Sequence, residues 1–426
     1  LSRPQVIERP SRTRGRSPRL LYLAALVLPL LLYLYIPLRA PATPYLRLPV
    51  GGGPDLVLYD NTPRDVVAMI TGSIFRGNLG LPGEAGLLER LTLAADLLRQ
   101  QVGAAGIVLA MLGLLNMLRR DWAIGLGLVL AYAAIVAFCM VYVIGDIADL
   151  FTPSYMIVAL CIAAGIELLA DFGRNVARIP ARSIVLLLAL ALPLTLLVQN
   201  WPRLDMSHQW ATRMAWDDLL RQPLPDNATL VSNDRDEMTP MWYIQYVEGI
   251  RRDLVGLFPK IKPEPEFETI GALLDWLLER GQQPHLIKPM PGLDIKYRLQ
   301  AEGQLTRVLG HAAPLPQPQR SLGVSIANVV ELTGADIQGT ISPGGELAIA
   351  LYWMPLAPMS EDYHTFVQLV DINGERLAGS DHRPGDVFYP ASQWRSGDVL
   401  VDRHLLEIPA NLRAGSYHLR AGMYSY

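Results

Sequence analysis

The stretch "WAIGLGLVLAYAAIVAFCMVYV" (Trp122–Val143) contains no charged side chain. A helix needs about 20 consecutive apolar residues to cross a bilayer core, so this stretch is typical of a transmembrane helix. The composition supports the same interpretation, because 51% of the 426 residues are hydrophobic and only 18% are charged. The formal net charge of −3 provides no basic excess for binding nucleic acid. We therefore predict a membrane protein with the lipid bilayer as a partner and no nucleic-acid partner.

Four more apolar stretches have the length and composition of membrane helices. Together with the first they predict five spans, at Leu20–Leu38, Val102–Leu118, Trp122–Val143, Pro153–Ala170 and Ser183–Val198. Charged side chains are almost absent from these stretches, which disfavours an ion channel, a pump or another transporter. The predicted fold class therefore begins with a polytopic α-helical membrane region over residues 1–200.

Arginines gather on alternate connections between the predicted spans. They lie within residues 1–20, at Arg119 and Arg120, and at Arg174, Arg178 and Arg182. Basic residues are retained on the cytoplasmic side of a membrane, so we assign all three groups to that side. The N-terminus of this chain is then cytoplasmic. The outer loop 41–101 and all residues after Asn200 lie outside the cell, and the plasma membrane is the predicted location.

The chain after Trp201 alternates short helical and strand patterns. Helices are predicted at 205–222, 240–250 and 268–281, and strands at 228–234, 253–260 and 285–289. Such alternation is typical of helices layered on a short sheet. We therefore predict a small extracytoplasmic α/β domain over residues 201–310.

Residues 321–426 have an all-β pattern. Apolar and polar residues alternate at 346–353, 364–371, 400–408 and 416–424, and turn sequences separate these strands. The length and pattern fit a β-sandwich domain over 321–426. The proline-rich stretch 311–320 marks the boundary before it.

The histidines and cysteines predict no metal site and no cofactor. All seven histidines follow Asn200, and none shows the short paired spacing of a zinc or iron site. Cys139 and Cys161 lie inside apolar stretches, so we interpret them as small buried hydrophobic residues without a disulfide.

The outer loop ends in an amphipathic stretch at residues 84–100. Leu87, Leu91, Ala94 and Leu98 recur at helical spacing, with charged residues between them. A helix of this kind could lie in the membrane interface and help to hold a lipid-linked ligand. Packing against neighbouring spans explains the same pattern.

An acidic turn precedes the second of the soluble helices. Asn233, Asp234, Asp236 and Glu237 follow the predicted strand 228–234, at the end where the strand meets the helix. Carboxylates at this edge of a sheet could bind sugar hydroxyls or a metal. Helix capping and compensation of the helix dipole explain the same acids without a ligand, and we predict Thr239 as the N-cap.

Two aromatic residues of the same helix are candidates for contact with a sugar ring. Trp242 and Tyr243, with Tyr246 one turn later, could form a stacking platform. Burial in the core of the α/β domain is the other interpretation, and the sequence leaves both open.

Several motifs resemble one family of membrane proteins. "LPDNATLVSNDRDEMTPMWYIQYVEGIRRDL" (Leu224–Leu254) is similar to the extracytoplasmic signature of a family with a domain of unknown function that includes protein O-mannosyltransferases. The sequences at 33–44, 67–77 and 143–159 are similar to further motifs of the family, in the same order. The resemblance covers roughly Leu20 to Lys260 and places the chain with the C-type membrane glycosyltransferases.

The resemblance implies transfer of a sugar from a polyprenyl-phosphate donor to an extracytoplasmic protein or glycan acceptor. Such a reaction needs a carboxylate base at the acceptor and positive charge for the departing phosphate. The acid to which the family's catalysis is assigned lies in an earlier outer loop and has no counterpart here. The chain also begins at Leu1 rather than at a methionine. We therefore expect this chain to be the C-terminal part of a longer enzyme, to lack the catalytic acid and to be inactive alone.

The same resemblance points to three residues that precede the second span. Asp60, Arg64 and Arg76 lie in the loop that the family folds over its catalytic cavity, and an arginine there could hold the donor phosphate. Anchoring of the arginines at the membrane interface is the other explanation. The sequence departs from the family pattern at Tyr59, where a tryptophan is usual.

A second interpretation is a non-catalytic, membrane-anchored protein that binds envelope carbohydrate or assists envelope assembly. An exposed aromatic strip on the C-terminal domain would favour it. The candidates for such a strip are Tyr352, Trp353, Phe388, Tyr389 and Trp394. Burial in the core of a sandwich is the alternative for all five.

Overall fold

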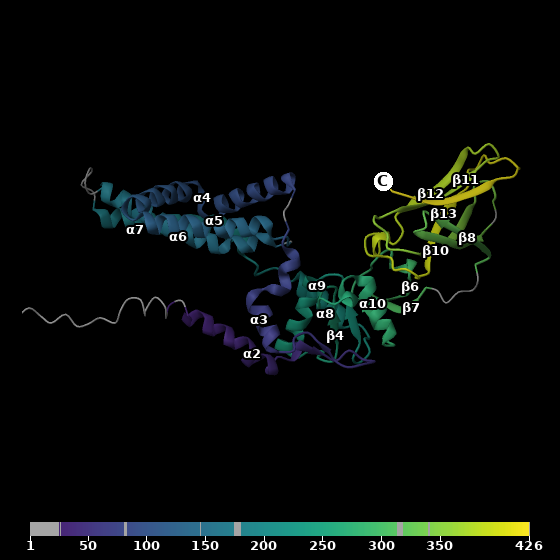
Figure 1. The fold of residues 1–426 in the computed structure, drawn as a ribbon, viewed down its shortest axis with the longest axis horizontal. Coiled ribbons are helices and arrows are strands. Elements are labelled where there is room, and N and C mark those ends of the chain that lie inside the picture. The colour runs from purple at the N-terminus through teal and green to yellow at the C-terminus, as the bar shows by residue number, and fades with distance from the viewer. Residues whose placement is uncertain are drawn as a thin grey trace, which may run out of the picture. The chain divides into compact units, whose positions relative to one another are not determined.

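The structure is a computed structural model that describes residues 25, 27–80, 83–144, 146–173, 180–312, 318–339 and 341–425. The chain divides into two compact units (Figure 1). One is a membrane unit, Val67–Gln209, and the other joins Leu1–Val66 with Trp210–Tyr426. The predicted limits of the membrane, α/β and β-sandwich domains stay predictions.

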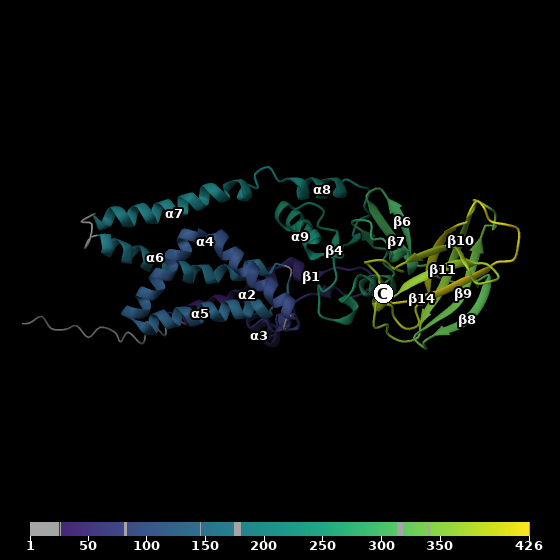
Figure 2. The same cartoon turned by 90° about the horizontal axis from the view of Figure 1, so that it is seen from above.

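The membrane unit is a bundle of long apolar helices (Figure 2). Its elements are η4 (Ser73–Asn78), α4 (Glu84–Arg120), α5 (Trp122–Val141), η5 (Ile147–Phe151), α6 (Thr152–Phe172) and α7 (Ala181–Leu204). Four described segments are long and apolar enough to cross a membrane, namely Gly86–Arg120, Trp122–Val141, Ile147–Phe172 and Leu187–Leu204. The chain is therefore a multi-pass membrane protein.

The predicted count of five spans is not confirmed. The first predicted span begins at Leu20, and its N-terminal part lies outside the described residues. Its described part belongs to the shorter apolar segment Leu28–Ala42, which comprises η1 (Leu28–Leu34), α2 (Tyr35–Arg39) and η2 (Ala40–Ala42). The arginines within residues 1–20, with Arg174 and Arg178, also lie outside the described residues.

Helix α4 joins the predicted amphipathic stretch to the predicted second span. Gly103 interrupts it with φ 65° and ψ 171°, a backbone conformation that glycine adopts readily because it has no Cβ. The interruption is one residue from the predicted start of the span at Val102. The sequence change from mixed to apolar residues therefore coincides with a break in the helix.

Helices α4 and α6 approach each other through glycines. A Cβ on Gly113 would lie 1.8 Å from the carbonyl oxygen of Cys161, and a Cβ on Gly165 would lie 2.1 Å from that of Leu109. Small residues allow membrane helices to pack with their backbones in close contact. The contact between α4 and α6 therefore depends on the absence of side chains at Gly113 and Gly165.

The part of the other unit after Trp210 contains a mixed five-stranded sheet in the order β4-β3-β5-β7-β6. Its strands are β3 (Thr229–Val231), β4 (Val255–Leu257), β5 (His285–Leu286), β6 (Tyr297–Glu302) and β7 (Leu305–His311). The associated helices are α8 (Ala211–Leu220), α9 (Arg235–Tyr243), the π-helical turn η7 (Ile244–Glu248), η8 (Pro265–Phe267), α10 (Ile270–Glu279) and η9 (Leu293–Ile295). Strands β3, β4 and β5 correspond to predicted strands, whereas the antiparallel pair β6–β7 was not predicted.

A segment from the predicted outer loop completes this fold. It contains η3 (Pro44–Leu46), β1 (Arg47–Leu48) and β2 (Leu56–Val57). Helix α3 (Pro63–Thr71) follows and crosses the boundary between the two units at Val66. Leu48, Val50 and Leu56 are buried in one core with Trp276 and Leu277 of α10. Part of the predicted loop is therefore structural, because it covers one side of α10.

The C-terminal region consists of two antiparallel sheets, β13-β10-β9-β8 and β12-β11-β14. Its elements are β8 (Arg320–Ile326), β9 (Val330–Gln338), β10 (Glu346–Pro355), β11 (His364–Val370), β12 (Arg376–His382), η10 (Ala391–Gln393), β13 (Leu400–Glu407) and β14 (His418–Tyr424). Buried residues of both sheets, such as Leu351 of β10 and Leu369 of β11, belong to one hydrophobic core. Strands β10, β11, β13 and β14 match predicted strands.

Lys296 is buried where the α/β fold meets the C-terminal sheets. Its side chain is 3% exposed, and its ammonium group donates to Asp275 of α10 at 2.8 Å and to Asp398 at 2.6 Å. Tyr389 donates to Asp398 at 3.0 Å, and Tyr297 donates to Asp275 at 2.8 Å. Burial, followed by the charge of Asp275, raises the pKa of Tyr297 well above its ordinary value. The tyrosine is therefore a neutral donor in a junction that joins the two folds.

Candidate functional site

The acidic turn lies at the carboxyl end of β3, as the sequence predicted. Asp234 is the N-cap of α9, and its carboxylate accepts a hydrogen bond from the backbone N–H of Asp236 at 2.9 Å. The prediction of Thr239 as the N-cap was wrong, because α9 begins four residues earlier and the Thr239 hydroxyl donates to the Arg235 carbonyl. The cap and the helix dipole account for Asp234 without a ligand.

Glu237 lies at the centre of a small polar cluster. Its carboxylate accepts from the Ser232 hydroxyl and from the Lys288 ammonium group, the latter at 2.6 Å. Lys288 follows β5, which pairs with β3 in parallel. The ion pair therefore holds the turn after β3 to the chain segment after β5. Lys288 was missed because nothing in the sequence indicates that these two strands are neighbours.

Asn233 and Asp236 are exposed on the same turn. Asp236 is paired with the adjacent Arg235 at 3.0 Å, and both side chains are largely exposed. An exposed ion pair contributes little to stability. Asn233 and Asp236 are therefore accessible to a ligand; Asp234 is exposed as well but serves as the helix cap.

The two aromatic candidates have different environments. The Trp242 ring stacks on Tyr45, with ring centroids 6.2 Å apart and planes inclined by 13°, and it also contacts Phe258. Tyr243 is 57% exposed. Trp242 therefore packs within the fold, and Tyr243 is the one available to a sugar ring. Tyr45 was missed because it lies far away in the sequence.

The three residues assigned from the loop resemblance are exposed. Asp60 and Arg64 flank the start of α3, where Thr62 and Asp65 form the cap through reciprocal hydrogen bonds. Arg76 is exposed in η4, within the membrane unit.

The C-terminal aromatic residues do not form an exposed strip. Tyr352, Trp353, Tyr389 and Trp394 are buried, and Phe388 packs partly buried against the same core. The Trp353 indole is fully buried and donates to Asp402 at 3.3 Å. These residues are core, which weighs against sugar stacking on this surface.

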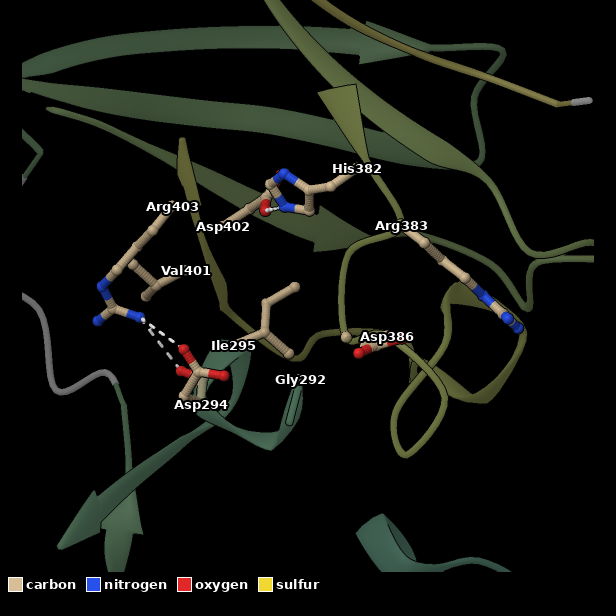
Figure 3. Close-up of a pocket in the computed structure, with 10 residues that line it drawn as sticks. Gly292, Asp294, Ile295, His382, Arg383, Asp386, Val401, Asp402 and Arg403 are labelled. Carbon is tan, nitrogen blue, oxygen red and sulfur yellow. Dashed lines mark hydrogen bonds and ion pairs between the residues drawn. The ribbon is translucent and has the colours of Figure 1, made fainter. Parts of the chain in front are cut away.

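A polar cavity of about 380 Å³ lies between η9 and the C-terminal sheets (Figure 3). Gly292, Asp294, Ile295, His382, Arg383, Gly385, Asp386, Val401, Asp402 and Arg403 line it. Figure 3 shows His382 and Asp402 facing one another, whereas the Arg383 side chain points away. The sequence did not predict this cavity, because its lining comes from separate loops and strands.

The His382–Asp402 pair continues into the core. His382 Nε2 lies 2.7 Å from one Asp402 carboxylate oxygen, and His404 Nε2 lies 3.0 Å from the other. Burial opposes ionisation of Asp402, but the hydrogen bonds with the two histidines outweigh it and hold the pKa of Asp402 well below its usual range. The hydrogen bond to Asp402 raises the pKa of His382. The cluster therefore keeps a carboxylate ionised inside the protein.

The spacing of the histidines along the chain predicted no metal site. The structure brings His382 of β12 together with Asp402 and His404 of β13. The one available signal was the Asp-x-His spacing at 402–404, because alternate residues of a strand point to the same face.

No protein-family model matches the chain. Searches of curated proteins and of solved structures find no match either.

Proposed function

We propose that this chain is part of a membrane glycosyltransferase that transfers a sugar from a polyprenyl-phosphate donor to an extracytoplasmic protein or glycan. The observation that carries the proposal is the acidic turn after β3, which occurs in a soluble α/β fold that follows the membrane helices. This order of elements agrees with the order of motifs in the O-mannosyltransferase-like family. The proposed location is the plasma membrane, with the acidic turn outside the cell.

The acidic turn is proposed to contact the acceptor. Asn233, Asp236 and Tyr243 are exposed and offer an amide, a carboxylate and an aromatic ring. These groups suit sugar or peptide hydroxyls. Asp234 and Glu237 have structural partners, so we assign them to holding the turn in place.

Asp60, Arg64 and Arg76 are proposed to act at the donor. A guanidinium group can bind phosphate through two parallel hydrogen bonds, which suits the departing polyprenyl phosphate. The exposure of Arg64 and Arg76 supports this role.

A membrane-anchored carbohydrate-binding protein is the second candidate. The observation that favours it is the open polar cavity beside His382 in the C-terminal region, which we interpret as a β-sandwich domain. The burial of the aromatic candidates weighs against this reading.

The test is a donor-turnover assay with the product of the complete native gene in proteoliposomes. Polyprenyl-phosphate mannose and glucose would be supplied, and released polyprenyl phosphate and transferred sugar would be measured. We expect turnover, and a loss of about tenfold or more in Asn233→Ala and Asp236→Ala if each removes a hydrogen bond to the acceptor. Asp218→Ala is the matched control, because Asp218 is an exposed acid of α8 that is paired with Arg221.

Glycan binding without turnover of either donor would support the second candidate. Turnover that is equally fast in Asp236→Ala, Asn233→Ala and Asp218→Ala would keep the transferase assignment but remove the acidic turn from the acceptor site.

A further inference from the structure

His382, Asp402 and His404 form a compact set of metal-type ligands. One donor atom from each residue can be chosen so that all lie within 4.8 Å of one another. Two ligands that each lie about 2.0–2.2 Å from a zinc ion are at most about 4.4 Å apart, so the three donor atoms lie close to the spacing that one ion needs. A small movement of the two rings away from Asp402 would therefore place all three around one ion.

The donor set selects a class of metal. Two imidazole nitrogens and one carboxylate suit first-row transition ions such as Zn²⁺ or Fe²⁺, whereas Mg²⁺ and Ca²⁺ prefer oxygen ligands. Three protein ligands also leave a coordination position open, as in catalytic zinc sites.

Neighbouring residues hold two of the ligands in place. Ser380 Oγ lies 3.3 Å from His404 Nδ1, and the Trp353 indole N–H donates to Asp402 at 3.3 Å. Ligating imidazoles usually have such a partner on the ring nitrogen away from the metal. The contact from Ser380 would direct His404 Nε2 towards the ion.

The three side chains of the cluster differ in exposure, and the exposed one gives an ion a way in. The side chains of His404 and Asp402 are 0% and 2% exposed, whereas that of His382 is 36% exposed. His382 and Asp402 line the cavity of Figure 3, so the cluster is reached from that side. Within the described residues, the ion-pair partners of Asp402 are these two imidazoles, and neither lysine nor arginine is among them.

We propose that His382, Asp402 and His404 bind one divalent transition-metal ion, with an open coordination position facing the cavity beside η9. The site is independent of the proposed transferase activity. It joins β12 of one sheet to β13 of the other. A bound ion would therefore cross-link the two sheets and present a Lewis acid to the cavity.

The test is titration with Co²⁺ and Zn²⁺ of the full chain, purified in detergent without a histidine tag and stripped with a chelator. We expect one equivalent of Co²⁺ to bind with visible ligand-field absorption bands, Zn²⁺ to displace it, and equimolar Mg²⁺ or Ca²⁺ to leave the bands unchanged. His418→Ala is the matched control, because His418 is an exposed histidine on another strand of the same region.

Three variants distinguish a metal site from a structural hydrogen-bonded cluster. His382→Ala and Asp402→Asn should lose the bands, and Ser380→Ala should bind about 10–100-fold more weakly because it removes only the partner of a ligand. His382→Ala is the primary variant, since its partly exposed ring can be removed with the fold checked by circular dichroism. The proposal is overturned if the wild type binds no Co²⁺, if folded His382→Ala binds it as tightly, or if Mg²⁺ competes equally.

Discussion

The buried Lys296 junction gives the sharpest prediction about stability. Replacement of Lys296 by methionine keeps much of the side-chain volume but removes the cation between Asp275 and Asp398. Removal of one partner from a buried ion pair costs about 3–5 kcal/mol, because the remaining charge stays buried without its main partner. Arg395 lies 3.5 Å from Asp275 and is the one further guanidinium that pairs with it among the described residues, so we expect the lower part of this range. For a folded unit of this size, that loss lowers the melting temperature by about 6–20 °C.

Lys288→Met is the matched control. Lys288 also pairs with a carboxylate at 2.6 Å, but its side chain is 34% exposed, compared with 3% for Lys296. Water solvates Glu237 after that replacement, so the expected cost is about 0–1 kcal/mol. The two variants differ mainly in burial, which isolates the effect of desolvation.

Thermal unfolding in detergent, followed by tryptophan fluorescence, would measure both variants. Addition of Asp275→Asn and Asp398→Asn to Lys296→Met should recover part of the lost stability, because it removes the two charges that have lost their ammonium partner. If Lys296→Met is no less stable than Lys288→Met, then burial of the junction does not control its energetics and the reasoning is refuted.

Two other changes test different parts of the fold. In the membrane unit, Gly113→Val should destabilise the contact between α4 and α6 by about 3 kcal/mol through overpacking. Gly127→Val is the control and should be tolerated, because no atom lies within 4 Å of the added Cβ. Unfolding of each variant in detergent measures the difference, and equal stability of the two variants would contradict the prediction. In the sheet, burial lowers the pKa of His285 in the folded protein below its value of about 6.5 in the unfolded chain. The neutral imidazole therefore contributes fully to the free energy of unfolding above about pH 6.5, and this contribution is lost as the pH falls towards the folded-state pKa. Denaturant titrations between pH 7.5 and pH 5 should therefore show a weaker pH dependence in His285→Phe, and an unchanged slope would exclude this role for His285.

The membrane helices were predictable because length and apolarity are properties of one continuous stretch. The α5 span and the change at Gly103 could be located in this way to within a few residues. Helix α10 was equally accessible, since Thr269 caps it and an apolar face follows. These are local features that need no knowledge of distant contacts.

The elements that were missed depend on distant partners or give a weak pattern. Strands β1 and β2 contain two residues each, which is too short to show a period. Strand β8 is almost entirely exposed and therefore lacks the alternation that marks a half-buried strand. The grouping of His382 with Asp402 and His404 depends on how two sheets pack, which no spacing in the sequence specifies.

The Lys296 junction also bears on how this protein can be rearranged in evolution. Lys296 precedes the proline-rich stretch 311–320, and its partners Tyr389 and Asp398 follow that stretch. A Cβ on Gly271 would lie 2.3 Å from the Tyr389 ring, so the helix and the later loop also fit together sterically. Recombination at the linker would separate Lys296 from Asp398, although Lys296 would keep its other partner, Asp275. Exchange of one fold alone would therefore leave Asp398 without its ammonium partner, although the sequence between the folds is of the kind at which modules are exchanged.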